Sequence, residues 1–320
     1  MGSSLVRRLV TDGEQVAILR LAHDDARALG QLSREVEHRV GDVRAPDTLT
    51  GALRGVDCVY HLAGVATAVN AHSRHMCAVN VDGTGHLMRA ALQSQVRRVV
   101  HTSSAIAIGI PDAATPVDES FAFNGGDFDH AYATTKRHGE EIVRGAVAEG
   151  LDVVILNPSA VMAPGGSLRH GWAGLVAAVH RGLLRAYPDG GVSMTPETDV
   201  ADAHVRAMQL GRTGERYIVA SHHLSYADLT RAIAEVVGVT PPRVRLPDAA
   251  VAVAGLLGSA VARVRSPEKS PFLTRENAVL MTRTMFYDQA KAVRELGVRA
   301  TPLEPAIAAV DAWCRRAGAV

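Results

Sequence analysis

The chain has 320 residues, 4% of them aromatic, and its 34 Lys and Arg against 33 Asp and Glu leave a net charge of +1. This length allows a full hydrophobic core with a smaller lobe, whereas the near-neutral charge and scarce aromatics argue against nucleic acid or an anionic membrane as partner. Three cysteines, Cys58, Cys77 and Cys314, form no disulfide or zinc pattern. We therefore expect a cytoplasmic protein that acts on a small molecule and holds no metal.

Short apolar strands and helical patterns alternate through the first half of the chain. Strands rich in Val, Ile and Leu are predicted at 15–20, 36–40, 57–63, 97–103 and 152–157. Helices are predicted between them, at 24–32, 46–54, 76–94 and 131–149. Such alternation is typical of βαβ units, in which helices cover both faces of a parallel sheet. The prediction is an α/β fold with a Rossmann-type doubly wound parallel sheet.

The pattern changes from Pro164 onward, where loops lengthen and Pro and Gly cluster. Here we predict a smaller, mainly helical C-terminal lobe in which only 216–220 is clearly strand-like. The longest apolar run, 249–262, is too short to span a bilayer and predicts a buried helix. Apolar side chains of this lobe serve its core or a pocket for an apolar substrate: Trp172, Leu175, Val176, Val179, Leu256, Leu257, Phe272, Met281, Met285 and Phe286.

Lysine is scarce in this chain, and one of its three lysines lies four residues after a tyrosine. The lysines are Lys136, Lys269 and Lys291, and the other 31 of the 34 basic residues are arginine. Tyr132 and Lys136 fall on one face of the predicted helix at 131–149. A nearby ammonium lowers the pKa of a tyrosine and makes it a general acid/base for a carbinol oxygen. By itself the spacing is weak, because an exposed helix face can carry both residues by chance.

The strands on either side of this helix end in polar residues. The strand at 97–103 runs into Ser104, and the strand at 152–157 ends at Asn157 and Pro158. In parallel α/β sheets, ligands bind at the carboxyl ends of the strands. We therefore expect Ser104, Tyr132 and the Asn157–Pro158 pair to converge on one site.

Seven motifs in order make the chain resemble the extended short-chain dehydrogenase/reductase superfamily, and within it the NAD-dependent epimerase/dehydratase family and its dihydroflavonol-reductase-like branch. The likeness covers essentially the whole length. The motifs are Gly41-Asp-Val43, Val59-Tyr-His-Leu-Ala-Gly64, Val79-Asn-Val-Asp-Gly-Thr84, His101-Thr-Ser-Ser104, Tyr132-x-x-x-Lys136, Asn157-Pro-Ser-Ala-Val161 and Asp199-Val-Ala-Asp-Ala-His204.

The resemblance implies a catalytic set and a cofactor crevice. Tyr132 would be the proton donor and acceptor, Ser104 would hydrogen-bond the substrate oxygen, and Lys136 would bind the nicotinamide ribose and lower the pKa of Tyr132. The residues implied for cofactor binding are Gly2, Asp42, Val43, Leu62, Ala63, Gly64, Lys136 and Pro158. Ser104 and Asp42 also have simpler interpretations, as a strand-end hydroxyl and a turn residue. Asn80 is expected to bond the backbone of a neighbouring strand, and His101 to be a packed strand residue.

Arg20 favours NADP over NAD as the cofactor. In dinucleotide-binding folds, an acidic residue after the second strand bonds the ribose 2′-hydroxyl, whereas an arginine suits a 2′-phosphate. Arg20 stands at that strand end here, and no carboxylate follows until Asp24. The alternative is that Arg20 is only a solvated charge at a strand end.

The chain departs from the superfamily at its start. Relatives begin with a strand and a Gly-x-x-Gly-x-x-Gly turn that holds the pyrophosphate. Gly2 here resembles the last of these glycines, and the residues after it resemble the following helix. We therefore expect the Rossmann domain to lack its central strand, with a gap of roughly 10 Å between the neighbouring strands. A version extended upstream by about a dozen residues is expected to add the strand and turn and to bind NADPH tightly.

These observations divide the chain into a dinucleotide-binding Rossmann domain, 1–162, to which 192–220 return, and a substrate lobe, 163–191 and 221–320. The favoured function is NADP-dependent reduction of a ketone or aldehyde on a small to medium apolar substrate. A nucleotide-sugar epimerase or dehydratase with the same triad is the first alternative. Arg20 counts against it, and Arg169, Arg181 and Arg185 are the only candidates for binding a diphosphate. A further alternative is a fold relative with a non-redox or ligand-binding role.

The resemblance also implies a homodimer formed through the helix of Tyr132 and its neighbour, for which the residues themselves give no further indication.

Overall fold

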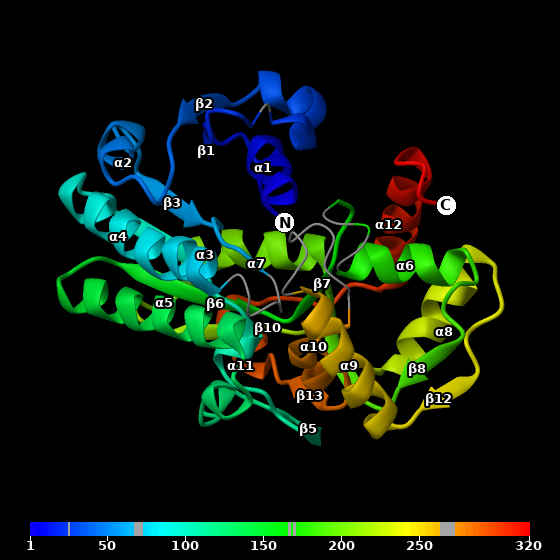
Figure 1. The fold of residues 1–320 in the computed structure, drawn as a ribbon. Helices are drawn as coiled ribbons and strands as arrows, with labels where there is room; N and C mark the ends of the chain where they lie inside the picture. The colour runs from blue at the N-terminus through cyan, green and yellow to red at the C-terminus, as the bar shows by residue number, and fades with distance from the viewer. Residues whose placement is uncertain (25, 67–72, 166–167, 169–170, 263–272) are drawn as a thin grey trace.

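The computed structural model describes residues 1–24, 26–66, 73–165, 168, 171–262 and 273–320. Its central element is a parallel four-stranded sheet, in which β10 (Arg216–Val219), β6 (Val153–Pro158), β4 (Arg98–Thr102) and β3 (Cys58–His61) lie in that order (Figure 1). Every residue of β6 is buried. Helices cover this sheet on both faces, so side chains on both sides of each strand must be apolar. This explains the apolar runs from which the strands were predicted.

Strands β1 (Ala17–Arg20) and β2 (Glu37–Val40) pair in parallel but form a sheet of their own. Within the described ranges, no ladder joins β1 to β3. Leu19 of β1 and Val40 of β2 are accordingly 40% and 53% exposed.

Two helical layers enclose the four-stranded sheet. On one face, α2 (Asp47–Ala52), α4 (Gly83–Gln93) and α5 (Ala131–Ala148) share a core with β3, β4 and β6. On the other face, α7 (Glu197–Leu210) and α11 (Ala290–Leu296) share a core with β10, β6 and β4. Helix α1 (Gly2–Thr11) packs on α7. This arrangement confirms the predicted α/β class; α7 packs on the sheet, and β10 pairs with β6.

Local details of the predicted helices differ. The segment predicted as one helix at 76–94 is α3 (Ser73–Cys77), a π-helical turn at Ala78–Asp82 and then α4. The predicted helix at 24–32 is a kinked 3₁₀ helix at Arg27–Arg34. Gly30 interrupts it with a φ of 57°, a conformation that glycine adopts without strain.

The C-terminal lobe contains a second sheet that the sequence did not predict. Strands β11 (His222–Ser225), β9 (Gly191–Pro196), β13 (Thr284–Tyr287) and β5 (Ala113–Val117) lie in that order, and β7 (Ala160–Met162) also pairs with β9. All of β9 is buried, including Ser193 and Thr195. A strand with buried hydroxyls lacks the continuous apolar run on which the prediction depended. The expectation that only 216–220 is strand-like in this region was therefore wrong.

Around this sheet, α6 (Trp172–His180), α8 (Tyr226–Val237) and α12 (Glu304–Arg316) enclose an apolar core. Strands β8 (Ala186–Pro188) and β12 (Val244–Leu246) form a parallel pair at its edge. Val176 and Val179 belong to this core, as predicted, whereas Phe272 lies outside the described residues.

Helix α9 (Asp248–Ala262) corrects a second expectation. The apolar run does form a helix, but it buries only Val251, Gly255, Gly258 and Ala262. Leu256 and Leu257 are 57% and 67% exposed. The buried side is narrow because small residues face α10 (Arg275–Met281), where a Cβ on Gly255 would lie 2.7 Å from the Ala278 Cβ. In the described part of the chain, no helix is long and apolar enough to cross a bilayer.

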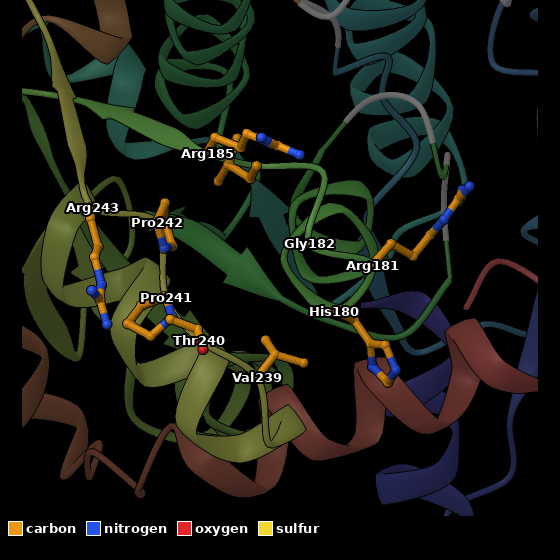
Figure 2. A pocket seen from close by; sticks show the side chains of 10 residues that line it. His180, Arg181, Gly182, Arg185, Val239, Thr240, Pro241, Pro242 and Arg243 are labelled. Atoms are coloured by element: carbon orange, nitrogen blue, oxygen red, sulfur yellow. The ribbon is translucent and has the colours of Figure 1, made fainter.

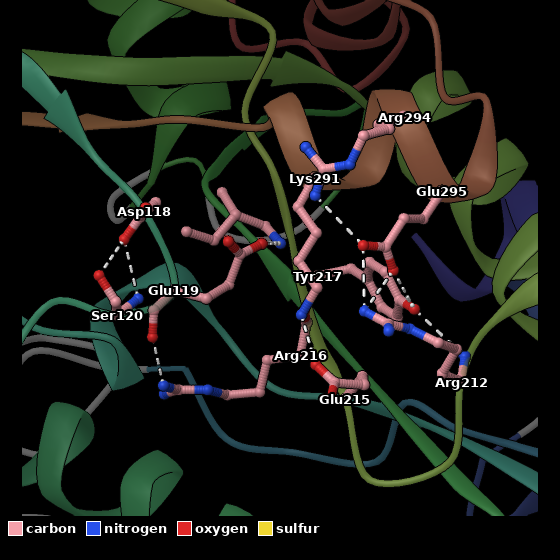
Figure 3. A network of polar contacts seen from close by, with 11 residues as sticks. Asp118, Glu119, Ser120, Arg212, Glu215, Arg216, Tyr217, Lys291, Arg294 and Glu295 are labelled. Carbon is pink, nitrogen blue, oxygen red and sulfur yellow. Dashed lines mark hydrogen bonds and ion pairs between the residues drawn. The ribbon is translucent and has the colours of Figure 1, made fainter.

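A polar network fixes α11 to β10 (Figure 3). Lys291 of α11 donates to Glu215 at 2.6 Å and to the carbonyl of Arg216 at 2.8 Å, and its ammonium lies over the Tyr217 ring. The Tyr217 hydroxyl donates to Glu295. One of the three lysines therefore has a structural role, which leaves Lys136 as the described lysine that needs a different explanation.

Candidate active site

Helix α5 carries the predicted acid/base pair. His130 begins the helix, and its Nδ1 accepts a hydrogen bond from the Ala133 N–H. Spacings of four residues then place Tyr132, Lys136 and Glu140 on one face. Lys136 is 6% exposed and Glu140 is fully buried, so this face of α5 lies against the sheet rather than in solvent. The chance interpretation, an exposed helix face, does not fit this burial.

Lys136 lies at the carboxyl end of β4. Its Nζ donates to the carbonyl of Thr102, the last residue of that strand, at 2.7 Å. A Cβ on Gly64, in the loop after β3, would lie 3.8 Å from the same Nζ. Burial lowers the pKa of Lys136 to about 8, and the Glu140 carboxylate opposes the shift. The ammonium is thus held where two strand ends meet.

Tyr132 and Ser104 form the other half of this site. A hydrogen bond joins their side chains and favours the phenolate, but burial dominates and raises the pKa of Tyr132. The sequence predicts a pKa lowered by Lys136, and the structure differs on this point. The Lys136 ammonium hydrogen-bonds the Thr102 carbonyl, and the loss of water around the phenol outweighs the contact with Ser104.

Glu140 is a residue that the sequence analysis missed. Its Oε1 accepts hydrogen bonds from Ser103 Oγ and from Asn157 Nδ2, both at 2.6 Å. The same Asn157 amide donates to the Ser104 carbonyl at 2.9 Å. Glu140 therefore connects α5 to the ends of β4 and β6. The available signal was its position four residues after Lys136, on the same helix face.

Two arginines neutralise the buried Glu140 carboxylate. Arg144 and Arg216 each approach its Oε2 at 3.4 Å. Arg216 also donates to the Glu119 carbonyl, which Figure 3 shows, and Glu119 accepts from the Ile218 N–H. A buried carboxylate is tolerated only when it is paired and hydrogen-bonded in this way.

The residues predicted for the adenosine end of a dinucleotide lie at the ends of β1 and β2. Arg20 Nη1 donates to the Asp24 carbonyl at 2.6 Å, while its Nε is buried and has no partner in the described chain. Asp42 accepts from Arg44 at 2.6 Å, and this pairing lowers the pKa of Asp42. Val43 is buried, and its carbonyl accepts from His86.

The remaining predicted cofactor residues occupy different environments. Leu62 packs with α1 and α7, whereas Ala63 and Gly64 are exposed in the loop that follows β3. Pro158 is buried at the end of β6, opposite Val219 of β10. Gly2 is the first residue of α1, and a Cβ there would meet no atom within 4 Å.

A dinucleotide therefore fits these residues at its two ends. Arg20 has an unpartnered guanidinium nitrogen at the adenosine end, and Lys136 holds an ammonium beside the Gly64 loop at the ribose end. Of the glycine-rich turn that would hold the pyrophosphate between these two ends, Gly2 is the one glycine among the described residues.

The expectation for Asn80 was right about the backbone and wrong about the strand. Asn80 makes a pair of hydrogen bonds with the backbone of Val65, at 2.8 and 3.0 Å, and Val65 lies in the loop after β3. The expectation for His101 is confirmed. His101 is buried in β4, and its ring lies 5.1 Å from that of His61. Burial lowers the pKa of both rings, that of His61 to about 3. Both histidines are therefore neutral at pH 7 and leave the proton chemistry to Tyr132.

A surface hollow of about 510 Å³ lies between the end of α6 and the segment before β12. Arg181, Arg185 and Arg243 stand around it (Figure 2). Arg181 and Arg185 are two of the predicted diphosphate candidates, and the third, Arg169, lies outside the described residues. The hollow shares no lining residue with the Tyr132 site. In the described part of the chain, no group of His, Cys, Asp and Glu could hold a metal ion.

Comparisons with known proteins agree with this geometry. The sequence model of the NAD dependent epimerase/dehydratase family matches residues 1–220. Sterol demethylase protein B of Methylococcus capsulatus is 32% identical over all of this chain and 97% of its own length. The 4-hydroxy-2-methyl-3-oxo-4-farnesyl-3,4-dihydroquinoline-1-oxide ketoreductase of Stigmatella aurantiaca is 25% identical over 93% of this chain and 88% of its own length. The crystal structure of gox2253 superposes with a TM-score of 0.85 and 29% identity, over 100% of this chain and 96% of that one.

Proposed function

This chain belongs to the NAD-dependent epimerase/dehydratase family of the extended short-chain dehydrogenase/reductase superfamily, and we propose that it is an NADP-dependent reductase of a ketone or aldehyde on an apolar substrate of small to medium size. The observation that carries the proposal is the buried face of α5. Tyr132 and Lys136 lie there at the ends of β4 and β6, with the Ser104 and Tyr132 side chains hydrogen-bonded to each other.

Each of these side chains has a defined role, and Lys136 has two. Ser104 donates a hydrogen bond to the substrate carbonyl oxygen and orients it towards Tyr132. Tyr132 gives its phenolic proton to that oxygen as the carbonyl carbon is reduced, and the raised pKa of Tyr132 keeps the proton in place until then. The Lys136 ammonium, fixed by the Thr102 carbonyl, binds the cofactor ribose and stabilises the phenolate that forms.

NADPH, when bound, supplies the hydride. Arg20 would hold its 2′-phosphate, Asp42 and Val43 its adenine, and Pro158 would lie behind the nicotinamide. The preference for NADP rests on Arg20, because a guanidinium matches phosphate oxygens and its Nε has no partner in the described chain. The apolar substrate class is supported by the relatives, whose names include a sterol and a farnesyl-substituted quinoline.

A nucleotide-sugar epimerase or dehydratase is the second candidate, and the family description favours it. Such an enzyme would use the same Tyr132, Lys136 and Ser104 and would regenerate its cofactor in every cycle. Net consumption of NADPH therefore separates the two functions.

The test follows NADPH absorbance with a panel of apolar ketones and aldehydes, and analyses the products. We expect stoichiometric loss of NADPH and formation of an alcohol. Tyr132→Phe is expected to lower kcat by about 10²–10⁴-fold, the usual contribution of a positioned acid. Tyr226→Phe is the matched control, because Tyr226 is a buried tyrosine of α8 in the other core. A rearranged sugar nucleotide without net loss of NADPH would identify the second candidate instead.

A further inference from the structure

Glu140 is a buried charge to which the proposed reaction assigns no part. Its side chain is fully buried and lies one helical turn beyond Lys136 on α5. A buried carboxylate is costly, and neutral residues of similar volume often stabilise a fold equally well or better. A charge at this position therefore points to a role in the site, and the contacts of Glu140 show on which groups it acts.

The first of these contacts leads to Ser104. Asn157 Nδ2 donates to Glu140 Oε1 at 2.6 Å and to the Ser104 carbonyl at 2.9 Å. A carboxylate and a carbonyl can only accept, so the Asn157 amide must keep its nitrogen on this side. Ser103 Oγ donates to the same Oε1 at 2.6 Å. Glu140 thus fixes two consecutive residues at the end of β4, and the second of them hydrogen-bonds Tyr132 through its side chain.

The second contact is electrostatic and concerns Lys136. The Lys136 side chain is buried, and its Nζ donates to the Thr102 carbonyl at 2.7 Å. Burial lowers the pKa of Lys136 to about 8, and the Glu140 carboxylate is the group that raises it. The Lys136 charge lowers the pKa of His61 on β3 and of His101 on β4, and burial keeps both rings neutral at pH 7. The negative charge that acts on this ammonium therefore comes from Glu140.

The other charged groups around Glu140 are positive. Arg144 and Arg216 each lie 3.4 Å from its Oε2. Tyr132, one turn before Lys136, carries its proton at neutral pH because burial raises its pKa. A neutral residue at position 140 would leave Lys136 with neighbours that are neutral or positive, and such neighbours favour loss of its proton.

We propose that Glu140 is a positioning residue of the active site, which keeps Lys136 charged and holds Ser104 in place through Asn157. The inference rests on the proposed function, in which the ammonium stabilises the phenolate of Tyr132 and Ser104 orients the carbonyl. A purely structural Glu140 would change the stability of the fold and leave the charge of Lys136 as it is. The charge of Lys136 is therefore the property to measure.

The scarcity of lysine makes this charge measurable. The chain has three lysines, so NMR of the full chain labelled with ¹³C only at lysine gives three side-chain signals. Lys136→Arg identifies the signal of Lys136 by its loss. Lys291, which donates to Glu215 at 2.6 Å, is the internal reference for an intact fold. We expect Lys136 of the wild type to titrate near pH 8.

Three variants separate charge from structure in this titration. Glu140→Gln keeps the volume and removes the charge, and should lower the Lys136 midpoint by at least about one pH unit, a tenfold change in its proton affinity. Glu140→Asp keeps the charge and should restore most of that shift. Glu141→Gln is the matched control, because Glu141 is the next residue and is 55% exposed, and it should leave the midpoint unchanged.

The same variants are tested in NADPH-dependent reduction of an apolar ketone. Reduction needs the Lys136 ammonium, so kcat should fall as pH rises through the Lys136 pKa, above about pH 8 in the wild type. In Glu140→Gln the fall should begin at a lower pH, by the interval that NMR measures. Asn157→Ala should lower kcat at least tenfold at pH 7 with a Lys136 midpoint near that of the wild type, because it releases Ser104 and keeps the Glu140 charge.

The results that contradict the proposal do not depend on one variant. A wild-type Lys136 midpoint near the ordinary value of about 10.4 would overturn it, since the ammonium would then need no support. Equal midpoints in Glu140→Gln and Glu141→Gln would overturn it as well, and wild-type kcat in Asn157→Ala would overturn the part that concerns Ser104. A lowered midpoint in Glu140→Gln of a protein that reduces no ketone would uphold the action of Glu140 on Lys136 and reject the proposed function instead.

Discussion

Replacing Glu140 with alanine is expected to destabilise the fold more than almost any other single change near the site. The carboxylate accepts two hydrogen bonds at 2.6 Å, from Ser103 Oγ and Asn157 Nδ2. Both donors are buried, so Glu140→Ala leaves them unsatisfied, at a cost of about 1–3 kcal/mol each.

The ion pairs of Glu140 contribute less. Arg144 and Arg216 lie at 3.4 Å and their side chains are 38% and 16% exposed, so solvent compensates part of their loss. The total is about 3–5 kcal/mol, the range observed when one member of a buried charged pair is removed. For a protein of this size, such a loss lowers Tm by roughly 10 °C.

Thermal unfolding at pH 7 measures this effect. Glu141→Ala is the matched control, because Glu141 is the next residue, is 55% exposed and forms one ion pair at 3.6 Å with Arg137. Its loss should cost less than about 0.5 kcal/mol. Glu140→Gln, which keeps the volume and one acceptor, should fall between the two. A Glu140→Ala protein as stable as the Glu141→Ala control would refute the role of the network.

Two further predictions concern acid stability and cofactor choice. Burial lowers the pKa of His61 to about 3 and lowers that of His101 as well. Below about pH 6.5 the unfolded chain therefore binds protons that the folded chain excludes. The free energy of unfolding should fall as pH drops from about 6.5 towards 4, by about 1.4 kcal/mol per pH unit for each histidine. His101→Phe should reduce that slope by one proton, measured as Tm against pH, and an unchanged slope would contradict the assignment of His101. Arg20→Glu should weaken NADPH binding at least tenfold while NADH binding changes little, measured by fluorescence titration; equal weakening of both would rule out a 2′-phosphate contact by Arg20.

The central strands β4 and β6 could be predicted because they are buried on both faces. Burial on both sides requires a continuous apolar run, as at 152–157, and such a run is visible in the sequence. The second sheet could not be predicted in this way. In β9, Ser193 and Thr195 are buried with their hydroxyls hydrogen-bonded to distant residues. The strand therefore has no apolar run, and its alternation from Val192 to Thr195 predicts one exposed face where the structure buries both.

For helix α9, the sequence predicted the element correctly but not its burial. Its composition indicates a helix correctly, but composition does not say whether a neighbouring element covers the second side. Gly255 allows α10 to approach closely on one side, and the leucines on the other side stay exposed.

The candidate site was partly predictable for a related reason. Tyr132 and Lys136 are neighbours on one helix, so their spacing alone reveals a shared face. Apart from Arg144 on the same helix, the partners of Glu140 come from positions 17 to 76 residues away in the chain. Only the assembled sheet brings Ser103, Asn157 and Arg216 around that carboxylate, so no local pattern announces it.

The central claim is that Tyr132 protonates a carbonyl oxygen during NADPH-dependent reduction. The most direct measurement is the single-turnover rate of NADPH oxidation with an apolar ketone, for the wild type and for Tyr132→Phe at equal NADPH saturation. Alcohol formed in step with NADPH loss, at a rate about 10²–10⁴-fold lower in Tyr132→Phe, is the result we predict. Equal rates for the two proteins would contradict the claim.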